Sequence, residues 1–130
     1  MTAVDESTDS TVGVAFARAL ARRDAVTLKG LMCPEVEFRA LTPGRFWEAD
    51  TAQEVVDDIL LGTWFTSTDE ITGVSDIETA VVGGRQRVGY RLSVTRGGDR
   101  HLVEQQAYLV PDGDRIAWLR IMCAGYQPAP

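Results

Sequence analysis

The stretch HLVEQQAYLVPDGDRIAWLRIMCAGY, residues 101–126, decides the fold because it alternates apolar and polar residues on both sides of a Pro-Asp-Gly turn. Alternation with a period of two is typical of a strand with one buried face, and Pro-Asp-Gly is typical of a type I turn followed by a glycine bulge. The segment therefore predicts a β-hairpin. Since His101, Gln105 and Cys123 interrupt its apolar face, we expect these three side chains to point toward the interior.

Two further turns, Gly83-Gly84 and Gly97-Gly98, extend the hairpin into a four-stranded antiparallel meander that begins near Ile71. If both turns are two-residue loops and Pro-Asp-Gly is a three-residue loop, the resulting register aligns a row of four charged residues across the strands. Their charges alternate in sign, which is typical of a solvated face. That row is Asp76, Arg91, Glu104 and Arg120. The opposite face is predicted to carry four rows: Thr79, Val88, Ala107 and Ala117; Ile77, Tyr90, Gln105 and Leu119; Ser75, Leu92, Val103 and Ile121; Gly73, Val94, His101 and Cys123.

Helical spacing precedes the strands. Apolar residues recur helically over 12–20. Asp24 can cap a second helix, ended by Pro34, that is expected to bury Val26, Leu28, Leu31 and Met32. Thr51 with Glu54 has capping-box spacing for a third helix reaching about Gly62. A short strand over 36–41 and the turn TPGRFWE lie between the last two helices. Three helices need an apolar surface to cover, so the chain predicts an α+β fold. We expect one domain over residues 10–126, a flexible tail over 1–9 and a short tail over 127–130.

The composition restricts the function. With 130 residues, 45% hydrophobic residues, a net charge of −6 and a pI near 4.7, the chain predicts one acidic domain that binds neither nucleic acid nor an anionic membrane. The polar N-terminus has no secretory pattern, so we expect a cytoplasmic protein with Cys33 and Cys123 as reduced thiols. One histidine and no CxxC motif argue against a zinc site, and we predict neither metal nor cofactor.

Three segments carry a resemblance to a known superfamily: RRDAVTLKGLMCPEVEFRA (22–40), PGRFWEADTAQEVVDDI (43–59) and PDGDRIAWLRI (111–121). With the order of elements over residues 10–126, the chain resembles the nuclear transport factor 2-like cone fold. This superfamily includes SnoaL-like polyketide cyclases, ketosteroid isomerases and limonene-type epoxide hydrolases. The resemblance implies a strongly curved sheet that forms a cone-shaped α+β barrel with the helices, around a pocket for a small hydrophobic molecule.

The resemblance also places residues in that pocket. A ketosteroid isomerase carries its carboxylate base, its phenolic donor and an inward carboxylic acid at positions that correspond to Thr42, Phe16 and Gln105. The cyclases and epoxide hydrolases use an acidic residue near the end of the last strand, where this chain reads Met122, Cys123 and Ala124. Because none of these groups is present, proton abstraction by a carboxylate is not predicted.

The remaining polar groups of the inward face are candidates for a site. Tyr90 and Gln105 are neighbours that either hydrogen-bond a ligand oxygen or bond each other. His101 is the candidate proton carrier. Opposite Cys123, it either activates the thiol or is an inert partner of a buried cysteine.

Aromatic residues provide the last candidates. Trp47 and Trp64 either form walls of the pocket or pack in the core, and Leu119 belongs to the pocket row. On the outer face, Tyr108, Ile116 and Trp118 indicate a homodimer, with a monomer as the alternative. We therefore expect a pocket protein, a cyclase or isomerase acting on a hydrophobic oxygenated metabolite. The alternative is a non-catalytic ligand-binding or protein-interaction module.

Overall fold

The computed structural model describes the backbone of residues 2–129 and the side chains of residues 12–129. Its helices are α1 (Thr2–Ala21), α2 (Ala25–Gly30) and the π-helix η1 (Glu54–Trp64). Its strands are β1 (Met32–Thr42), β2 (Arg45–Ala49), β3 (Glu70–Val82), β4 (Arg85–Arg96), β5 (Asp99–Asp112) and β6 (Arg115–Pro128). The α+β class is thereby confirmed. The flexibility expected of residues 1–9 stays a prediction, since the side chains of residues 1–11 lie outside the described part.

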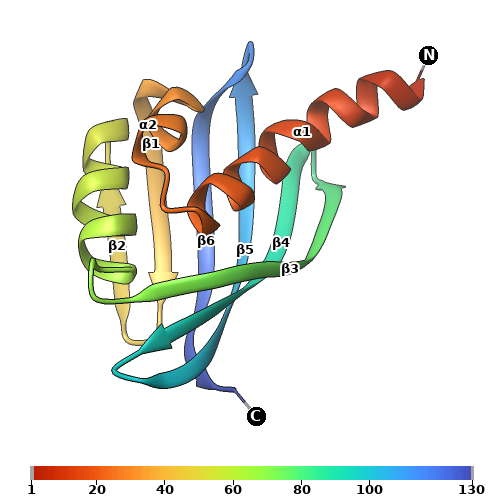
Figure 1. The fold of residues 1–130 in the computed structure, drawn as a ribbon. Helices are drawn as coiled ribbons and strands as arrows, with labels where there is room; N and C mark the ends of the chain where they lie inside the picture. Colours follow the sequence, from red (N-terminus) through yellow and green to blue (C-terminus); the bar gives the residue numbers. More distant parts are fainter. Residues whose placement is uncertain (1, 130) are drawn as a thin grey trace.

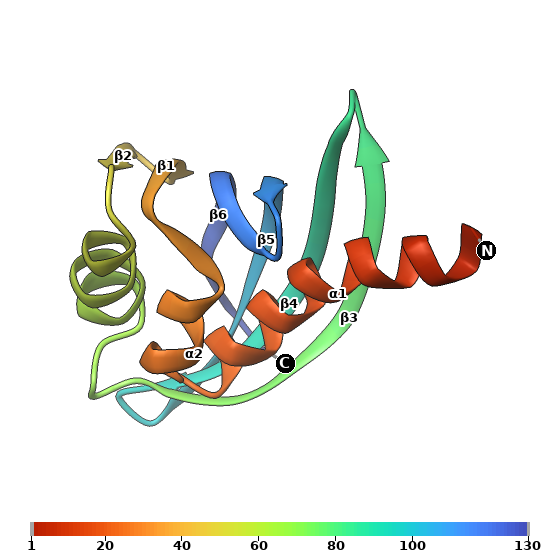
Figure 2. The same cartoon turned by 90° about the horizontal axis from the view of Figure 1, so that it is seen from above.

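The six strands form one open sheet in the order β2-β1-β6-β5-β4-β3. All neighbours are antiparallel except β1 and β6, so the sheet is mixed rather than purely antiparallel. The sheet curves strongly, and the three helices lie inside the curve, with α1 crossing the concave face in front of β4 and β5 (Figure 1). Seen from above, β3 bends around the helices toward η1 (Figure 2). The expected cone of helices and curved sheet is therefore present.

The helices follow the predicted apolar pattern. In α1, Phe16, Ala19 and Leu20 are fully buried, and in η1 the apolar residues on one face (Val55, Val56, Ile59 and Leu60) are buried. The Asp24 cap of α2 is present, with Thr27 N donating to Oδ1 over 3.1 Å. Two expectations for this region are wrong. Val26 is 83% exposed, and Pro34 lies inside β1, where a bulge between Met32 and Glu37 accommodates a residue without an N–H donor.

The capping box before η1 is also confirmed, because Glu54 N donates to Thr51 Oγ1 over 3.1 Å. The helix itself differs from an ordinary α-helix. At its end Phe65 N donates to Leu60 O, five residues back, as the wider π-helical turn requires. The helix therefore continues to Trp64, past the expected end near Gly62, and delivers the Trp64 ring into the core.

The register of the meander is confirmed in part. The β4–β5 pairing agrees throughout, with Tyr90 opposite Gln105 and Arg91 opposite Glu104. Two bulges shift the pairing of β3 with β4 by one or two residues from the predicted register, so Leu92 faces Val74 instead of Ser75. Between β5 and β6 the loop is Gly113-Asp114, and bulges at both ends of the pairing place Leu119 opposite Leu109 and Cys123 opposite Gln105.

These shifts preserve the predicted faces of the central strands. Gln105 and Leu119 are fully buried, whereas Glu104 is exposed and Arg120 pairs with Glu37 on the outer face. At Leu119 and Cys123 the observed pairing with β5 differs from the predicted pairing by four residues. Because four is an even number, inward and outward positions do not exchange there. Ile116 is the exception. A bulge beside it turns its side chain into the core, so its placement on the outer face is wrong.

Candidate functional site

The centre of the concave sheet face holds a buried polar pair. Tyr90 on β4 and Gln105 on β5 are directly opposite each other, and the Tyr90 hydroxyl donates to Gln105 Oε1 over 2.6 Å. Tyr90 is 1% exposed and Gln105 is fully buried. Among the described residues, Gln105 Nε2 has no hydrogen-bond partner. The pair therefore fixes the orientation of the amide and leaves its NH₂ group available for a further acceptor.

Two predicted pocket residues, Phe16 and Cys123, lie beside this pair. The Phe16 ring of α1 contacts the Tyr90 ring edge-on at 6.5 Å, and Cys123 faces Gln105 from β6. Leu119 lies elsewhere in the same core, opposite Leu109 and therefore four residues from Gln105 along β5. Burial raises the pKa of Tyr90 above its usual value, and the nearby Cys123 adds to the effect. Tyr90 therefore acts as a neutral donor to the amide and does not supply a phenolate.

A second group of predicted residues gathers over β1 and β2. Trp47 Nε1 donates to Thr42 Oγ1 over 2.8 Å, and the Trp47 and Trp64 rings meet edge-on at 5.9 Å. The Arg45 guanidinium stacks on the Trp47 ring, with Cζ 3.6 Å from the ring centroid. Trp64 is 7% exposed, and its Nε1 has no partner among the described residues. This cluster supplies an aromatic wall with one buried donor.

Contrary to the prediction, His101 does not lie opposite Cys123. It faces Pro128, because the loop and bulges between β5 and β6 shift the pairing. The half-buried imidazole packs edge-on against Tyr126 at 5.6 Å, and its Nδ1 lies 3.2 Å from Asp99 O. Cys123 is half-buried, and its Sγ accepts from Gly125 N over 3.4 Å. The predicted thiol–imidazole pairing on neighbouring strands is therefore wrong.

An ion pair that the sequence did not predict closes one end of the sheet. Asp69 is buried, with 2% of its side chain exposed, and accepts from Arg96 Nε and Nη2 over 2.8 and 2.9 Å. Thr66 N donates to the same carboxylate over 2.9 Å. Chiefly because of the Arg96 hydrogen bond, the pKa of Asp69 is lowered to about 2. The bidentate pair therefore ties the segment before β3 to the end of β4.

The same arginine reaches the last turn of η1. Arg96 Nη2 and Tyr126 Oη both donate to Trp64 O, over 3.2 and 2.7 Å, and the guanidinium stacks 3.8 Å from the Tyr126 ring centroid. Burial raises the pKa of Tyr126 to about 12. These contacts hold the Trp64 backbone, and with it the indole that faces the core. A threonine-rich turn ending in aspartate, residues 66–69, was the available signal, but nothing in the sequence links it to Arg96.

Metal binding and membrane insertion each require a recognisable structural feature. Among the residues that the structure describes, no three histidine, cysteine or acidic side chains gather as a metal site would require. Within the same part of the chain, no helix combines the length and apolar character needed to cross a bilayer.

Comparison with known proteins identifies the fold of the chain but finds no close relative. No protein-family model and no curated protein matches the chain. Among solved structures, a LEH-like epoxide hydrolase from M. tuberculosis matches with a TM-score of 0.67 and 14% identity, over 90% of this chain and 83% of that one. A Catenulispora acidiphila protein with a ketosteroid isomerase-like fold, in complex with trimethylamine, matches with a TM-score of 0.63 and 13% identity, over 85% and 82%. An NTF2-like protein of unknown function from Cytophaga hutchinsonii matches with a TM-score of 0.54 and 12% identity, over 86% of each chain.

The chain thus has the NTF2-like cone fold, in agreement with the resemblance carried by its sequence motifs. At these identities the likeness defines the fold alone, and the function has to be argued from the site.

Proposed function

We propose that the interior of the cone binds a small, mostly apolar molecule through a single oxygen acceptor, such as a carbonyl, ether or epoxide oxygen. The observation that carries this proposal is the Gln105 amide, whose Oε1 is held by Tyr90 while its fully buried Nε2 is unpaired among the described residues. An unpaired buried donor costs about 1–3 kcal/mol, a cost that a ligand acceptor would remove. Phe16 and Cys123 supply apolar surface beside the pair, and Leu119 and the Trp47–Trp64 pair belong to the same continuous core.

The catalytic form of this proposal is a cyclase or isomerase reaction with His101 as the proton carrier. His101 lies four residues from Gln105 along β5, which corresponds to about 13 Å of strand. The substrate would therefore have to span from the amide to the imidazole. Solved structures of the same fold include a LEH-like epoxide hydrolase, which supports chemistry on an oxygenated apolar molecule.

A second candidate function is binding without catalysis. It is favoured by the chemistry of the central pair, because an amide and a phenol with a raised pKa neither take up nor release a proton near neutral pH. Replacing His101 separates the two candidates. In the catalytic form, His101→Ala abolishes turnover and leaves ligand affinity unchanged, whereas a binding module has no turnover to lose.

The binding proposal is tested with a ketone and its hydrocarbon counterpart, α-tetralone and tetralin. Because a neutral hydrogen bond contributes about 1 kcal/mol, the protein is expected to bind the ketone about fivefold more tightly. Gln105→Leu should remove this preference while retaining the affinity for tetralin. Equal affinities of the unmodified protein for both compounds, measured by calorimetry, would contradict the proposal.

We also propose a homodimer through the outer sheet face. Phe46, Leu41 and Met122 lie side by side on β2, β1 and β6 and are 55%, 45% and 55% exposed. They border a shallow cavity of about 330 Å³ that Tyr108 also lines. Trp118 contributes less than expected, because the guanidinium groups of Arg85 and Arg120 stack on its ring at 4.6 and 4.2 Å. An apolar row of this kind is typical of an interface.

Sedimentation equilibrium at micromolar concentration is expected to give twice the chain mass of 14.2 kDa. Met122→Glu should convert the dimer to a monomer, because it places a charge in the centre of the row. Asp112→Asn, which changes an exposed charge in the β5–β6 turn, is the control and should remain dimeric. A monomeric mass for the unmodified protein would count against this interface.

A further inference from the structure

A cavity separate from the Tyr90–Gln105 pair lies between the end of α1 and the first half of β3. Its volume is about 870 Å³, within the range of sites for small organic molecules. The lining comes from residues 18 and 21–23, at and just after the end of α1, and from residues 67–74 of the opposite segment. Neither Tyr90 nor Gln105 belongs to this lining. We call it the α1–β3 cleft.

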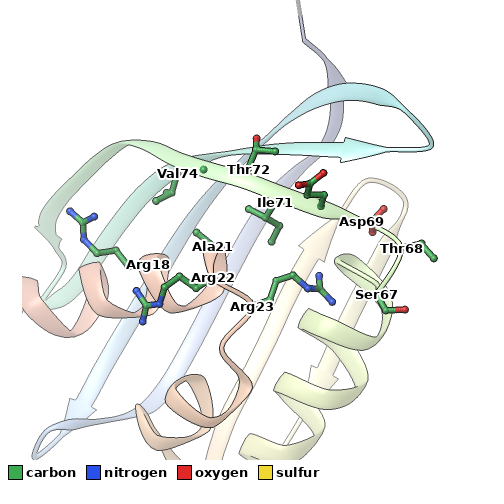
Figure 3. A pocket seen from close by; sticks show the side chains of 12 residues that line it. Arg18, Ala21, Arg22, Arg23, Ser67, Thr68, Asp69, Ile71, Thr72 and Val74 are labelled. Carbon is green, nitrogen blue, oxygen red and sulfur yellow. The ribbon is translucent and has the colours of Figure 1, made fainter.

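The helix side of the α1–β3 cleft is cationic. Arg18 on α1 and Arg22 just after its end are exposed and one turn apart, since Arg22 N donates to Arg18 O over 3.1 Å. Both line the cleft (Figure 3), and flexible side chains at this spacing can turn toward one ligand group. Among the described residues, Arg18 has no carboxylate partner, and Arg22 has Asp24 only at 3.8 Å. Arg23 is already engaged, since its Nη1 donates to Phe65 O over 2.7 Å. Two guanidinium groups are therefore available in a chain whose net charge is −6.

The opposite side offers apolar surface and one free charge. Ile71 and Val74 are half-buried and point from β3 toward α1, where Ala21 lies, while Thr72 points away (Figure 3). The carboxylate of Asp69 is neutralised by its bidentate bond to Arg96 and does not oppose the two arginines. Glu70, which is exposed, remains as the one uncompensated carboxylate of the lining. Three arginines line the cleft, and Glu70 together with Asp24, 3.8 Å from Arg22, offsets two of their charges. The net single positive charge suits a ligand with one negative charge.

From this arrangement we infer that the α1–β3 cleft binds an apolar monocarboxylate. The carboxylate would lie between Arg18 and Arg22, whose planar guanidinium groups match its geometry, and the apolar body would cover Ala21, Ile71 and Val74. A phosphate dianion fits less well, because it would bring a second negative charge close to Glu70. The cleft is a site separate from the oxygen-binding interior and does not depend on it.

The inference is tested with 2-naphthoate and 2-naphthol, which share the ring system and differ in charge at neutral pH. Calorimetry is expected to show about tenfold tighter binding of 2-naphthoate, and the preference should shrink at high ionic strength because the two arginines are exposed. In amide proton–nitrogen spectra, 2-naphthoate should shift residues 67–74 and the end of α1.

Three variants sharpen the test. Arg18→Gln with Arg22→Gln is expected to weaken 2-naphthoate binding about tenfold, whereas Glu70→Gln should strengthen it about threefold by removing the opposing charge. Arg115→Gln, which removes an exposed arginine at the β5–β6 turn, is the matched control and should change nothing. Gln105→Leu should also leave 2-naphthoate binding unchanged, so this cleft and the interior site succeed or fail separately.

Equal affinities for 2-naphthoate and 2-naphthol would overturn the inference. So would spectral shifts confined to the residues around Tyr90 and Gln105, or an unchanged affinity in the double arginine variant. A stronger response to inorganic phosphate than to 2-naphthoate would show that the cleft selects a different anion and would equally reject the monocarboxylate.

Discussion

Arg96→Ala is expected to lower the free energy of unfolding by about 2–3 kcal/mol, a large effect for a side chain that reaches the surface. The substitution leaves the carboxylate of Asp69, with 2% of its side chain exposed, without its bidentate partner. It also removes one donor to Trp64 O and the stacking on Tyr126. The effect stays below that of a fully buried pair because 43% of the Arg96 side chain is exposed.

Arg91→Ala is the matched control. Arg91 also sits on β4 and pairs with two carboxylates, those of Asp76 and Glu104, but all three side chains are about half exposed. Exposed pairs contribute about 0–1 kcal/mol, so denaturant unfolding should show a change below about 0.5 kcal/mol. If the two variants lose equal stability, the Asp69–Arg96 pair does not hold this end of the sheet.

The same ion pair predicts how stability depends on pH. The pKa of Asp69 is about 2 in the folded protein, below its ordinary value of 3.8. A lowered pKa favours the folded state at every pH above 3.8, and the contribution is lost as the pH falls from about 4 toward 2. The loss amounts to about 2 kcal/mol. In Arg96→Ala this acid-dependent part should largely disappear, because Arg96 is the main cause of the lowered pKa.

The buried pair gives the second large effect. Tyr90→Phe is expected to cost about 2 kcal/mol, because it leaves the fully buried Oε1 of Gln105 without a donor. Gln105→Leu should cost about 1 kcal/mol, since it leaves the Tyr90 hydroxyl unpaired but also removes the unpaired Nε2.

The double variant Tyr90→Phe with Gln105→Leu is expected to be at least as stable as the unmodified protein, because no unpaired polar group remains at the pair. Chemical denaturation of all four proteins gives the coupling between the two side chains. Strictly additive losses, adding up to about 3 kcal/mol, would mean that the two groups do not form a coupled pair. A stabilised double variant that has lost its preference for the ketone would indicate that the polar pair is kept for binding.

The sequence predicted the fold class and the face of most residues on the central strands. The Gly97-Gly98 turn predicted the β4–β5 register directly, since a two-residue loop allows one pairing, and Gly83-Gly84 did the same for β3 and β4 next to the turn. The bulges could not be predicted, because an extra residue in a strand leaves no signature in the alternation beyond the bulge. Together with the shorter Gly113-Asp114 loop, they moved His101 away from Cys123. The bulge next to Ile116 turned that side chain inward, while Gln105, Leu119 and Cys123 kept the predicted face because the pairing there differs by an even number of residues.

The contacts of the site could be predicted only where they are local in sequence. Tyr90 and Gln105 are neighbours through one short hairpin, so local sequence was sufficient to pair them. Asp69, Arg96 and Tyr126 come together from three separate segments through the curvature of the sheet, and local patterns carry no information on such contacts. The π-helical form of η1 was likewise hidden, because its buried apolar residues have the spacing of an ordinary helix.

The side-chain amide of Gln105 is the group whose behaviour decides whether the interior is an oxygen-binding site. In nitrogen-labelled protein, α-tetralone is expected to shift the Gln105 Nε2 proton resonances downfield as a new hydrogen bond forms, while tetralin leaves them nearly in place. Resonances that respond alike to ketone and hydrocarbon, or to neither, would contradict the assignment of this amide as the donor that recognises the ligand.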